Sequence, residues 1–277
     1  MLGDELSALA SQLSSAVVLL EPLLGRGPCS SFRLTLADGQ VLKAKRLESA
    51  AVAERVDRLL RRLAHAAFPP VYLRRGGSIM TRWVPGQPLG PTAGEADVLR
   101  TCGAIHAVVH AARPAAAPPS GRWRSRAHRR AWLQADLDAL VAAGWLTRDD
   151  AAAVQMVVDR HAPEDWTVGI VHGDFNPENL IRGAAGDIAA IDNETLSIGA
   201  RAYDLARTWY RWPMDTTQLA AYLEGYGCAG GVAELERHFP FWGLTVLTRG
   251  AAFRLRARRH GIAEPMARLR ESLETWR

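Results

Sequence analysis

The most informative part of the sequence is VHGDFNPENLI, Val171 to Ile181, followed by DIAAIDNE, Asp187 to Glu194. An apolar lead-in precedes Asp174, Asn179 follows five residues later, and Asp192 ends the next β-like run. Transfer of a phosphoryl group to a hydroxyl needs a carboxylate that orients the nucleophile and accepts its proton. It also needs hard oxygen ligands for Mg²⁺. Asp174, Asn179 and Asp192 supply this set from neighbouring loop ends.

This block resembles the catalytic loop of aminoglycoside phosphotransferases and choline-kinase-like enzymes, in which HGDxxxxN is followed by IDxE. The resemblance implies that Asp174 is the catalytic base, that His172 orders the loop, and that Asn179 and Asp192 bind Mg²⁺. Taken singly, an Asp or Asn before an apolar strand is more often a turn residue or a helix cap. The ordered combination is what indicates a kinase.

Two further carboxylates have counterparts in the same family. Asp204, in YDLART, is similar to the aspartate at the start of a helix that braces the catalytic loop. Glu194, two residues after Asp192, is expected to lie near the metal or on the substrate side. His106, in GAIHAVVH, matches the LH helix of the family and is expected to be a buried structural histidine rather than a ligand or a base.

The N-terminal third has the pattern of an antiparallel sheet. Alternating apolar residues in Ser31 to Ala37 and in Val41 to Arg46 flank Asp38-Gly39, a strong hairpin signal because the turn requires positive φ. Further strands are predicted at residues 71–73 and 78–84. Helical spacing predicts one helix through Leu6, Leu9, Leu13, Val17 and Leu20, and another over residues 50–65.

Nucleotide binding in such folds requires a loop over the phosphates and a strand lysine. The segment before the hairpin, LGRGPCSS from Leu24 to Ser31, places backbone amides where they can cradle phosphate oxygens. The expected phosphate-binding residues are Gly25, Gly27, Ser30 and Ser31.

The lysine is Lys43 if VLK is the family motif, or Lys45 if it is counted from Gly39, and both side chains project to the same face of the strand. The sequence leaves both open. Glu54, on the following helix, matches the glutamate that pairs with the lysine in the family. Without that context, each of these residues would be interpreted as a solvated surface charge.

The segment IMTRWVPGQPL, from Ile79 to Leu89, resembles the hinge of the family. Adenine is expected to meet backbone groups near Arg82 to Val84, with Met80 or Thr81 behind it. A buried strand end is the alternative for each of these residues.

From Asp97 onward, alanine- and leucine-rich helical patterns dominate, apart from one β-like block at residues 169–192. The resemblance therefore implies a bilobal, protein-kinase-like α+β fold. Residues 1–86 form the N-terminal lobe, a small antiparallel sheet with a hinge at about residues 80–86. Residues 87–277 form a mainly helical C-terminal lobe with the catalytic loop and the acceptor site.

Composition excludes several other classes of protein. The three cysteines are few and widely spaced, so neither a disulfide framework nor a zinc site is expected. The apolar runs are too short to span a bilayer, and the start of the chain lacks the features of a secretory signal. The net charge of +5 comes without a recognisable nucleic-acid-binding module. We expect a cytoplasmic protein, monomeric or homodimeric, that binds neither nucleic acid nor membranes.

The expected activity is transfer of the γ-phosphate of ATP, with Mg²⁺, to a hydroxyl of a small molecule. The absence of an APE segment agrees with a small-molecule acceptor. An antibiotic, nucleoside, sugar or amino alcohol is favoured over a polycationic aminoglycoside, because the segments expected to face the acceptor are rich in arginine and aromatic residues. These residues are Arg122, Trp123, Arg124, Arg126, Trp132, Trp209, Tyr210, Arg211 and Trp212. The alternative is a pseudokinase that binds nucleotide as a sensor or scaffold.

Overall fold

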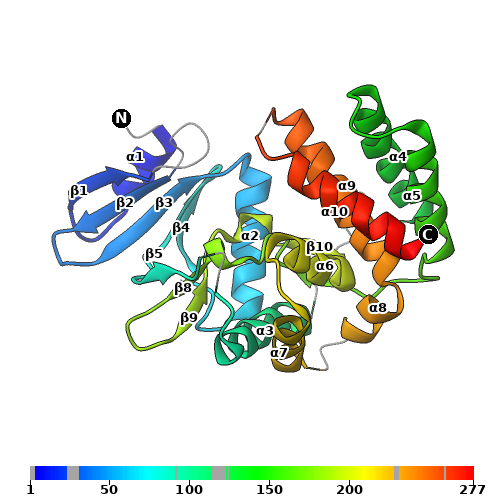
Figure 1. The fold of residues 1–277 in the computed structure, drawn as a ribbon. Helices are drawn as coiled ribbons and strands as arrows, with labels where there is room; N and C mark the ends of the chain where they lie inside the picture. Colours follow the sequence, from blue (N-terminus) through cyan, green and yellow to red (C-terminus); the bar gives the residue numbers. More distant parts are fainter. Residues whose placement is uncertain are drawn as a thin grey trace. The chain divides into compact units, whose positions relative to one another are not determined.

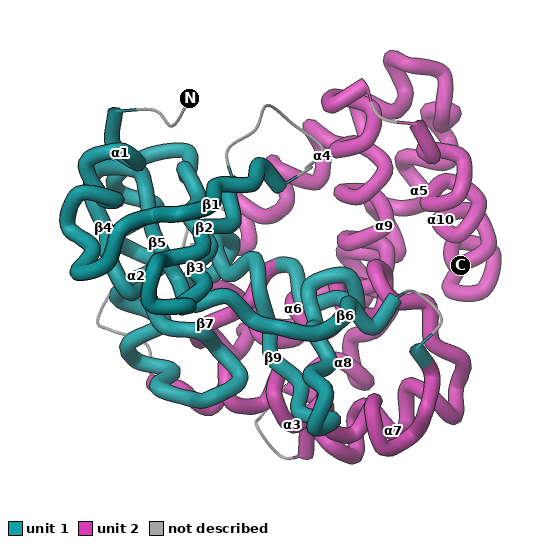
Figure 2. The backbone as a smooth tube through the Cα atoms, turned by 90° about the vertical axis from the view of Figure 1, so that its left-hand side faces the viewer, with its two compact units in different colours: residues 1–93, 174–197 teal, residues 94–173, 198–277 magenta. Residues whose placement is uncertain are grey.

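The computed structural model describes residues 4–23, 31–90, 93–113, 123, 125–227, 231–258 and 260–277. The chain forms two compact units (Figure 2). Unit 1 combines residues 1–93 with residues 174–197, and unit 2 combines residues 94–173 with residues 198–277. These limits differ from the expected division at residue 86, because the segment that begins at Asp174 belongs with the N-terminal residues.

Unit 1 is built on a five-stranded antiparallel sheet of order β1-β2-β3-β5-β4 (Figure 1). The predicted hairpin is present as β2 and β3, with Leu34 opposite Leu42 and Gly39 at φ 83° in the turn. β3 also pairs with β5, which places Lys43 beside Thr81 and Lys45 beside Ile79. The strands are β1 (Val17–Pro22), β2 (Ser31–Leu36), β3 (Val41–Arg46), β4 (Val71–Arg75) and β5 (Ser78–Arg82).

One face of this sheet carries a hydrophobic core closed by helix α1 (Asp4–Ala10). Leu6 and Leu9 of α1 pack with Leu34, Leu42 and Met80 of the sheet. The prediction of a single helix through residue 20 was wrong, because the helix ends at residue 10 and residues 17–22 form β1. The β-branched pair at residues 17 and 18 suits a strand, and β1 pairs with β2 along one edge, with a register shift between Val17 and Leu19.

Helix α2 (Ala50–Leu63) matches the predicted helix. It begins because the Ser49 hydroxyl accepts a hydrogen bond from the backbone N–H of Val52, which satisfies one of the free donors of the first turn. It ends at Ala64, which adopts a left-handed conformation. Its buried face consists of Ala53, Val56, Leu59, Leu60 and Leu63.

The second segment of unit 1 is a short β-hairpin that carries the conspicuous sequence motif. Strand β8 (Leu180–Arg182) pairs with β9 (Ile188–Ala190) and with β6 (Gln87–Pro88). Short 3₁₀ turns, η2 (Pro177–Asn179) and η3 (Asn193–Thr195), flank the hairpin. The N–H of Ala190 donates to Ala67 O at 2.7 Å, so this hairpin is joined to the N-terminal residues by backbone hydrogen bonds.

Unit 2 is mainly helical, as predicted for residues 97 onward. Strand β7 (Val168–Val171) pairs with β10 (Ser197–Ala200) in a two-stranded sheet. The HGD motif follows β7, and helix α6 follows β10. The helices are α3 (Ala96–Ala111), α4 (Arg126–Ala142), α5 (Arg148–Arg160), α6 (Arg201–Arg211), α7 (Thr216–Tyr226), α8 (Val232–Arg237), α9 (Phe239–Arg256) and α10 (Ala263–Trp276).

Helices α3 and α7 approach each other very closely (Figure 1). A Cβ atom at Gly103 of α3 would lie 2.1 Å from Tyr222 O, and one at Gly225 of α7 would lie 2.0 Å from Arg100 O. Only glycine permits such backbone contact. The close approach brings tyrosines of α7 against histidines of α3, and these side chains form part of the site described below.

Among the described residues, none of the helices has both the length and the hydropathy that a bilayer-spanning helix requires.

The core beneath the sheet provides a test of the packing in unit 1. Leu42 is fully buried between α1 and the sheet, so Leu42→Ala leaves a cavity and should lower the free energy of unfolding by about 2–5 kcal/mol. Urea denaturation measures this change. The control is Val18→Ala on β1, where the side chain is 63% exposed and the loss should stay below about 1 kcal/mol. Equal losses for the two variants would contradict the packing.

Candidate active site

The loop that contains Asp174 is held by two asparagine side chains. Asn179 Nδ2 donates to Asp174 O at 2.9 Å and to Asp174 Oδ2 at 3.1 Å. Asn176 Nδ2 donates to Asp174 O at 2.9 Å, and Asn176 also caps η2 by accepting the N–H of Glu178. Pro177 suits the first position of that turn because its φ is already fixed near the helical value. The structure therefore brings Asp174 and Asn179 together as the spacing predicts.

Asp192 lies beside Asn179 because the two strand ends share a backbone hydrogen bond. The N–H of Ile191, the residue before Asp192, donates to Asn179 O at 2.8 Å. Asp192 itself has φ 56° and ψ 46°, in the left-handed region that non-glycine residues rarely occupy. Strained backbone of this kind is often found at functional sites, and aspartate tolerates it better than most residues.

Both candidate lysines reach the carboxylate of Asp192. Lys43 Nζ lies 2.6 Å from Asp192 Oδ1 and Lys45 Nζ lies 3.2 Å from the same oxygen. Lys45 also forms an ion pair with Glu194. Because residues 43 and 45 project to one face of β3, the strand delivers two ammonium groups to one charged cluster. The cluster of Lys43, Lys45, Asp192 and Glu194 is called the charge cluster below.

The pKa shifts of Asp192 and Lys45 favour the ionised state of both groups. Burial alone would raise the pKa of Asp192, but Lys43 and Lys45 outweigh burial and hold that pKa below its ordinary value. Burial alone would lower the pKa of Lys45, yet Glu194 and Asp192 together raise it above its ordinary value. The carboxylate of Asp192 and the ammonium of Lys45 therefore stay charged at neutral pH.

The expected ion pair between Glu54 and a strand lysine is not formed within the described part of the chain. Glu54 is exposed, since the buried face of α2 runs through residues 53, 56, 59, 60 and 63. The neighbouring Arg55 points to the turn that follows Asp192 instead. Its Nε donates to Leu196 O at 3.0 Å and its guanidinium also donates to Glu194 O at 3.3 Å.

The residues expected around the nucleotide fall into different places. Met80 is fully buried in the α1 core, on the face of the sheet opposite to the lysines. Thr81 pairs with Lys43, and its side chain lies on the lysine face. Arg82 is exposed at the end of β5, and Val84 is half-buried in the segment that follows.

The expected phosphate-binding loop is described only in part. Gly25, Gly27 and Ser30 lie outside the described residues. Ser31 is the first residue of β2, where its carbonyl accepts the N–H of Leu23 at 2.9 Å and where it pairs with Lys45.

The backbone before Asp174 is fixed by Asp204. Asp204 Oδ2 accepts the N–H of His172 at 2.7 Å and Oδ1 accepts the N–H of Gly173 at 2.8 Å. This is the bracing contact that the sequence resemblance implies. The His172 side chain is fully buried, and Gly173 adopts φ 78°.

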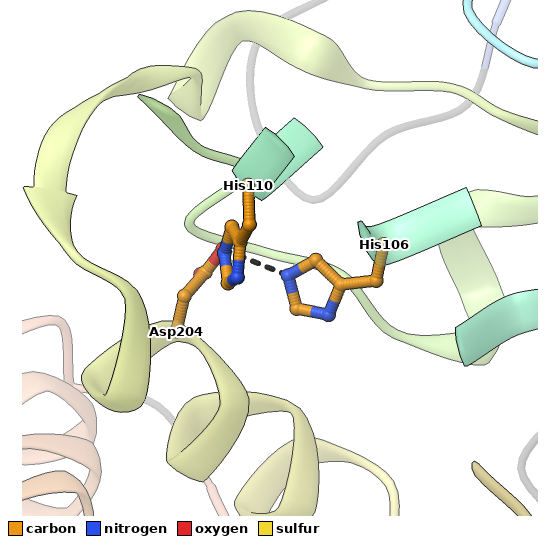
Figure 3. A group of neighbouring side chains, drawn as sticks. All are labelled: His106, His110 and Asp204. Carbon is orange, nitrogen blue, oxygen red and sulfur yellow. Dashed lines mark hydrogen bonds and ion pairs between the residues drawn. The ribbon is translucent and has the colours of Figure 1, made fainter. Parts of the chain in front are cut away.

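Two histidines of α3 also contact Asp204 (Figure 3). His106 Nε2 lies 2.9 Å and His110 Nε2 lies 3.2 Å from Asp204 Oδ2. Their other ring nitrogens contact tyrosines of α7, with Tyr222 Oη 2.6 Å from His106 Nδ1 and Tyr226 Oη 2.6 Å from His110 Nδ1. His106 is a buried core histidine, as predicted from the sequence.

The pKa shifts in this network follow from burial and hydrogen bonding. Burial alone would raise the pKa of Asp204, but hydrogen bonds from His106 and His110 hold it well below its ordinary value. Burial and then the neighbouring His106 lower the pKa of His110 to about 4, although Asp204 opposes this. Asp204 is therefore ionised and His110 neutral at neutral pH.

The aromatic residues expected at the acceptor are divided between core and surface. Trp123, Tyr210 and Trp212 are buried, whereas Trp132 and Trp209 are half-buried. The guanidinium carbons of Arg129 and Arg249 lie 4.9 Å and 4.6 Å from the ring centroid of Trp132. Arg268 lies 4.6 Å from the ring centroid of Trp209.

The remaining arginines of that set are described only in part. Arg126 is exposed and donates to Pro163 O. Arg211 is half-buried at the end of α6. Arg122 and Arg124 lie outside the described residues.

Three residues of the site were not found from the sequence. Asn176 had a usable signal, since Asn-Pro marks a turn start. His110 lies four residues after His106, the spacing that places two side chains on one helix face. Arg55 had no signal, because its partners are backbone carbonyls far away in the sequence.

Residues 28–238 match the phosphotransferase enzyme family. The fold is shared with choline kinase LicA from Streptococcus pneumoniae, at a TM-score of 0.70 and 16% identity over 98% of this chain and 97% of that one. It is also shared with an aminoglycoside phosphotransferase from Alicyclobacillus acidocaldarius, at a TM-score of 0.67 and 17% identity over 98% of this chain and 93% of that one. Macrolide 2′-phosphotransferase MphH from Brachybacterium faecium matches at a TM-score of 0.63 and 20% identity, over 98% of this chain and 97% of that one.

LicA has also been solved in complex with AMP, and that structure matches this chain at a TM-score of 0.70 and 14% identity over 99% of this chain and 97% of that one. No curated protein sequence matches the chain significantly. The protein-kinase-like α+β fold and the family match define a small-molecule phosphotransferase. The chain belongs to the phosphotransferase enzyme family.

The lowered pKa of His110 predicts a pH dependence of stability. His110 has a pKa of about 4 in the fold against 6.5 ordinarily, so the unfolded chain binds its proton at higher pH. The free energy of unfolding should therefore fall as pH drops from about 6.5 to about 4, with a contribution from His110 of about 3 kcal/mol. The pKa of Asp204 lies well below 3.8, so the contribution of Asp204 to stability is lost only at pH values below those at which His110 takes up its proton.

Urea denaturation of wild type and His110→Gln between pH 7 and pH 4 measures this contribution. The variant should show the shallower loss of stability, since glutamine does not titrate. Parallel curves for the two proteins would contradict the assignment of His110 as a buried neutral ring.

Proposed function

We propose that the protein transfers the γ-phosphate of ATP to a hydroxyl of a small molecule, with Asp174 as the catalytic base and Mg²⁺ bound by Asn179 and Asp192. The observation that carries the proposal is the convergence of Asp174, Asn179 and Asp192 with two strand lysines in unit 1. This is the donor set that phosphoryl transfer requires.

The donors fit a magnesium ion. Asn179 donates to Asp174 through its amide nitrogen, so its amide oxygen is the atom suited to a cation. Both lysines contact Oδ1 of Asp192, so Oδ2 is the oxygen of this carboxylate that is suited to a cation. Carboxylate and amide oxygens are hard ligands of the kind that Mg²⁺ prefers. When bound, Mg²⁺ would offset the negative charge of the phosphates.

The remaining roles in the proposed reaction fall to side chains of the protein. Asp174, with its carboxylate fixed by Asn179, orients the acceptor hydroxyl and takes its proton as the new bond forms. Lys43 and Lys45 supply positive charge to the phosphates, and Glu194 keeps Lys45 in place. Arg55 holds the backbone carbonyls of Glu194 and Leu196, so the turn after Asp192 keeps its shape.

The acceptor that we propose is neutral or anionic. Trp132 and Trp209, two half-buried tryptophans of unit 2, each have an arginine stacked on the ring. A quaternary amine or an aminoglycoside would have to displace these guanidinium groups to use the same rings. Nucleoside and sugar hydroxyls are therefore favoured over choline, aminoglycosides and macrolides that carry an amino sugar.

The catalytic role of Asp174 is tested by Asp174→Asn. Acceptor-dependent release of ADP should fall by roughly 10²- to 10⁴-fold, because the amide cannot accept the proton, while ATP binding persists. A panel of macrolides, nucleosides, sugars, choline and aminoglycosides identifies the acceptor. The control is Asp187→Asn in the exposed turn of the β8–β9 hairpin, which should retain wild-type turnover. ATP binding without turnover on any acceptor would favour a pseudokinase, and absence of ATP binding would exclude the kinase.

The two lysines should differ in their effects. Lys43→Met should weaken ATP binding about tenfold or more through the loss of an ammonium group, with little change in stability because Lys45 still pairs with Asp192. Lys45→Met should also lower the free energy of unfolding, by about 1–3 kcal/mol, because it leaves Glu194 without this partner. Calorimetric titration with ATP and urea denaturation measure the two effects. Unchanged ATP affinity in both variants would refute the assignment.

A further inference from the structure

The buried hydrogen-bond network around Asp204 is more extensive than is needed to fix one loop. It joins α3, α6 and α7 to the backbone of His172 and Gly173, all within unit 2. Asp204, His106 and His110 are almost completely buried, with exposed fractions of 2%, 0% and 0%. Figure 3 shows both imidazole rings turned towards the Asp204 carboxylate. Tyr222 and Tyr226, behind the rings, are likewise buried.

The chemistry of the groups fixes the direction of the hydrogen bonds around Asp204 and His110. An ionised carboxylate can only accept, so His106 and His110 donate to Asp204 through Nε2–H. The neutral ring of His110, protonated at Nε2, accepts at Nδ1. The Tyr226 hydroxyl therefore donates to His110 and selects the tautomer that can donate to Asp204. The Tyr222 hydroxyl pairs with Nδ1 of His106 and holds that ring in place.

These two tyrosine–histidine pairs determine how Asp204 is oriented. Its Oδ2 accepts both rings and the His172 N–H, and its Oδ1 accepts the Gly173 N–H. A carboxylate held on several sides by buried donors has little freedom to rotate. The two amides that it holds belong to the residues directly before Asp174 in the chain.

We propose that His106 and His110, each oriented by a tyrosine of α7, are positioning residues that act through Asp204 to set the backbone in front of the catalytic Asp174. This inference rests on the proposed function, because it assigns the pairs a role in turnover. It assigns them no contact with ATP or with the acceptor. Their loss should therefore lower kcat and leave KM for ATP nearly unchanged.

A shared metal ion is the competing explanation of the same side chains. The candidate ligand atoms of His106, His110 and Asp204 all lie within 4.8 Å of one another. Two ligands of one tetrahedral zinc ion are about 3.3 Å apart, given bonds near 2.0 Å. The separation of 2.9 Å between His106 Nε2 and Asp204 Oδ2 is that of a hydrogen bond. The geometry therefore favours protons, not a metal, between these atoms.

The experiment compares paired substitutions at His110 and Tyr226. His110→Leu removes the donor to Asp204, whereas His110→Gln keeps an N–H near the position of Nε2. We expect kcat to fall about 10- to 100-fold in His110→Leu and to recover partly in His110→Gln. Tyr226→Phe removes only one hydroxyl, so it should fold even where His110→Leu does not, and we expect a fall of about 3- to 10-fold.

The matched control is His238→Leu. His238 is a half-buried histidine of unit 2 whose Nδ1 contacts the carbonyl of His161, away from Asp204. It should leave kcat near the wild-type value even if it lowers the melting temperature. A merely structural role for His110 and Tyr226 predicts the same behaviour in their variants, namely a lower melting temperature with unchanged kcat, and that result overturns the proposal.

A second readout does not depend on catalysis. Amide hydrogen exchange of His172 and Gly173 should speed up at least about tenfold in Tyr226→Phe and His110→Leu, but not in His238→Leu. If wild type shows no turnover on any acceptor, the proposed function fails, and this exchange measurement still decides whether the pairs hold the loop. Unchanged exchange, or a stoichiometric zinc ion that mass spectrometry finds in wild type and not in His110→Leu, overturns the proposal.

Discussion

Charge neutralisation at Asp192 joins the two chain segments of unit 1. The carboxylate lies on a strained turn, and the two lysines of β3 that neutralise it come from the other segment. A half-buried carboxylate without a positive partner would cost several kcal/mol or would bind a proton. The sheet must therefore present Lys43 and Lys45 on one face, and the β8–β9 hairpin must lie against the N-terminal residues. The hydrogen bond between Ala190 and Ala67 accomplishes the second requirement.

The parts of this arrangement that depend on short sequence separation could be predicted. Asp38-Gly39 between alternating strands determines a hairpin because the turn demands positive φ, and the β2–β3 pair has that register. The five-residue spacing of Asp174 and Asn179 is short enough for one loop to bring the side chains together. Strand periodicity also predicts that Lys43 and Lys45 share a face, whatever their partners.

Some features could not be predicted from the sequence, because tertiary contacts alone decide which of two neighbouring residues takes a given place. The apolar residues from Leu13 to Leu20 satisfy a helical period, yet pairing with β2 makes residues 17–22 a strand. The buried face of α2 fixes the rotation of this helix, and the rotation decides that Arg55, and not Glu54, faces the turn after Asp192. Met80 lies on the core side because β5 aligns it with Ala44 between the lysines. These outcomes depend on register and rotation, which carry weak local signals.

Because a ribosome makes the chain from its N-terminus, the two segments of unit 1 are synthesised at different times. Lys43 and its partner Asp192 are separated by 149 positions. At a synthesis rate of about 5–20 residues per second, Lys43 emerges roughly 7–30 s before the carboxylate. During that interval the lysine face of β3 has neither its anionic partner nor the adjoining hairpin. The nascent β3 strand therefore exposes a cationic surface in the cell until the segment that contains Asp192 is translated.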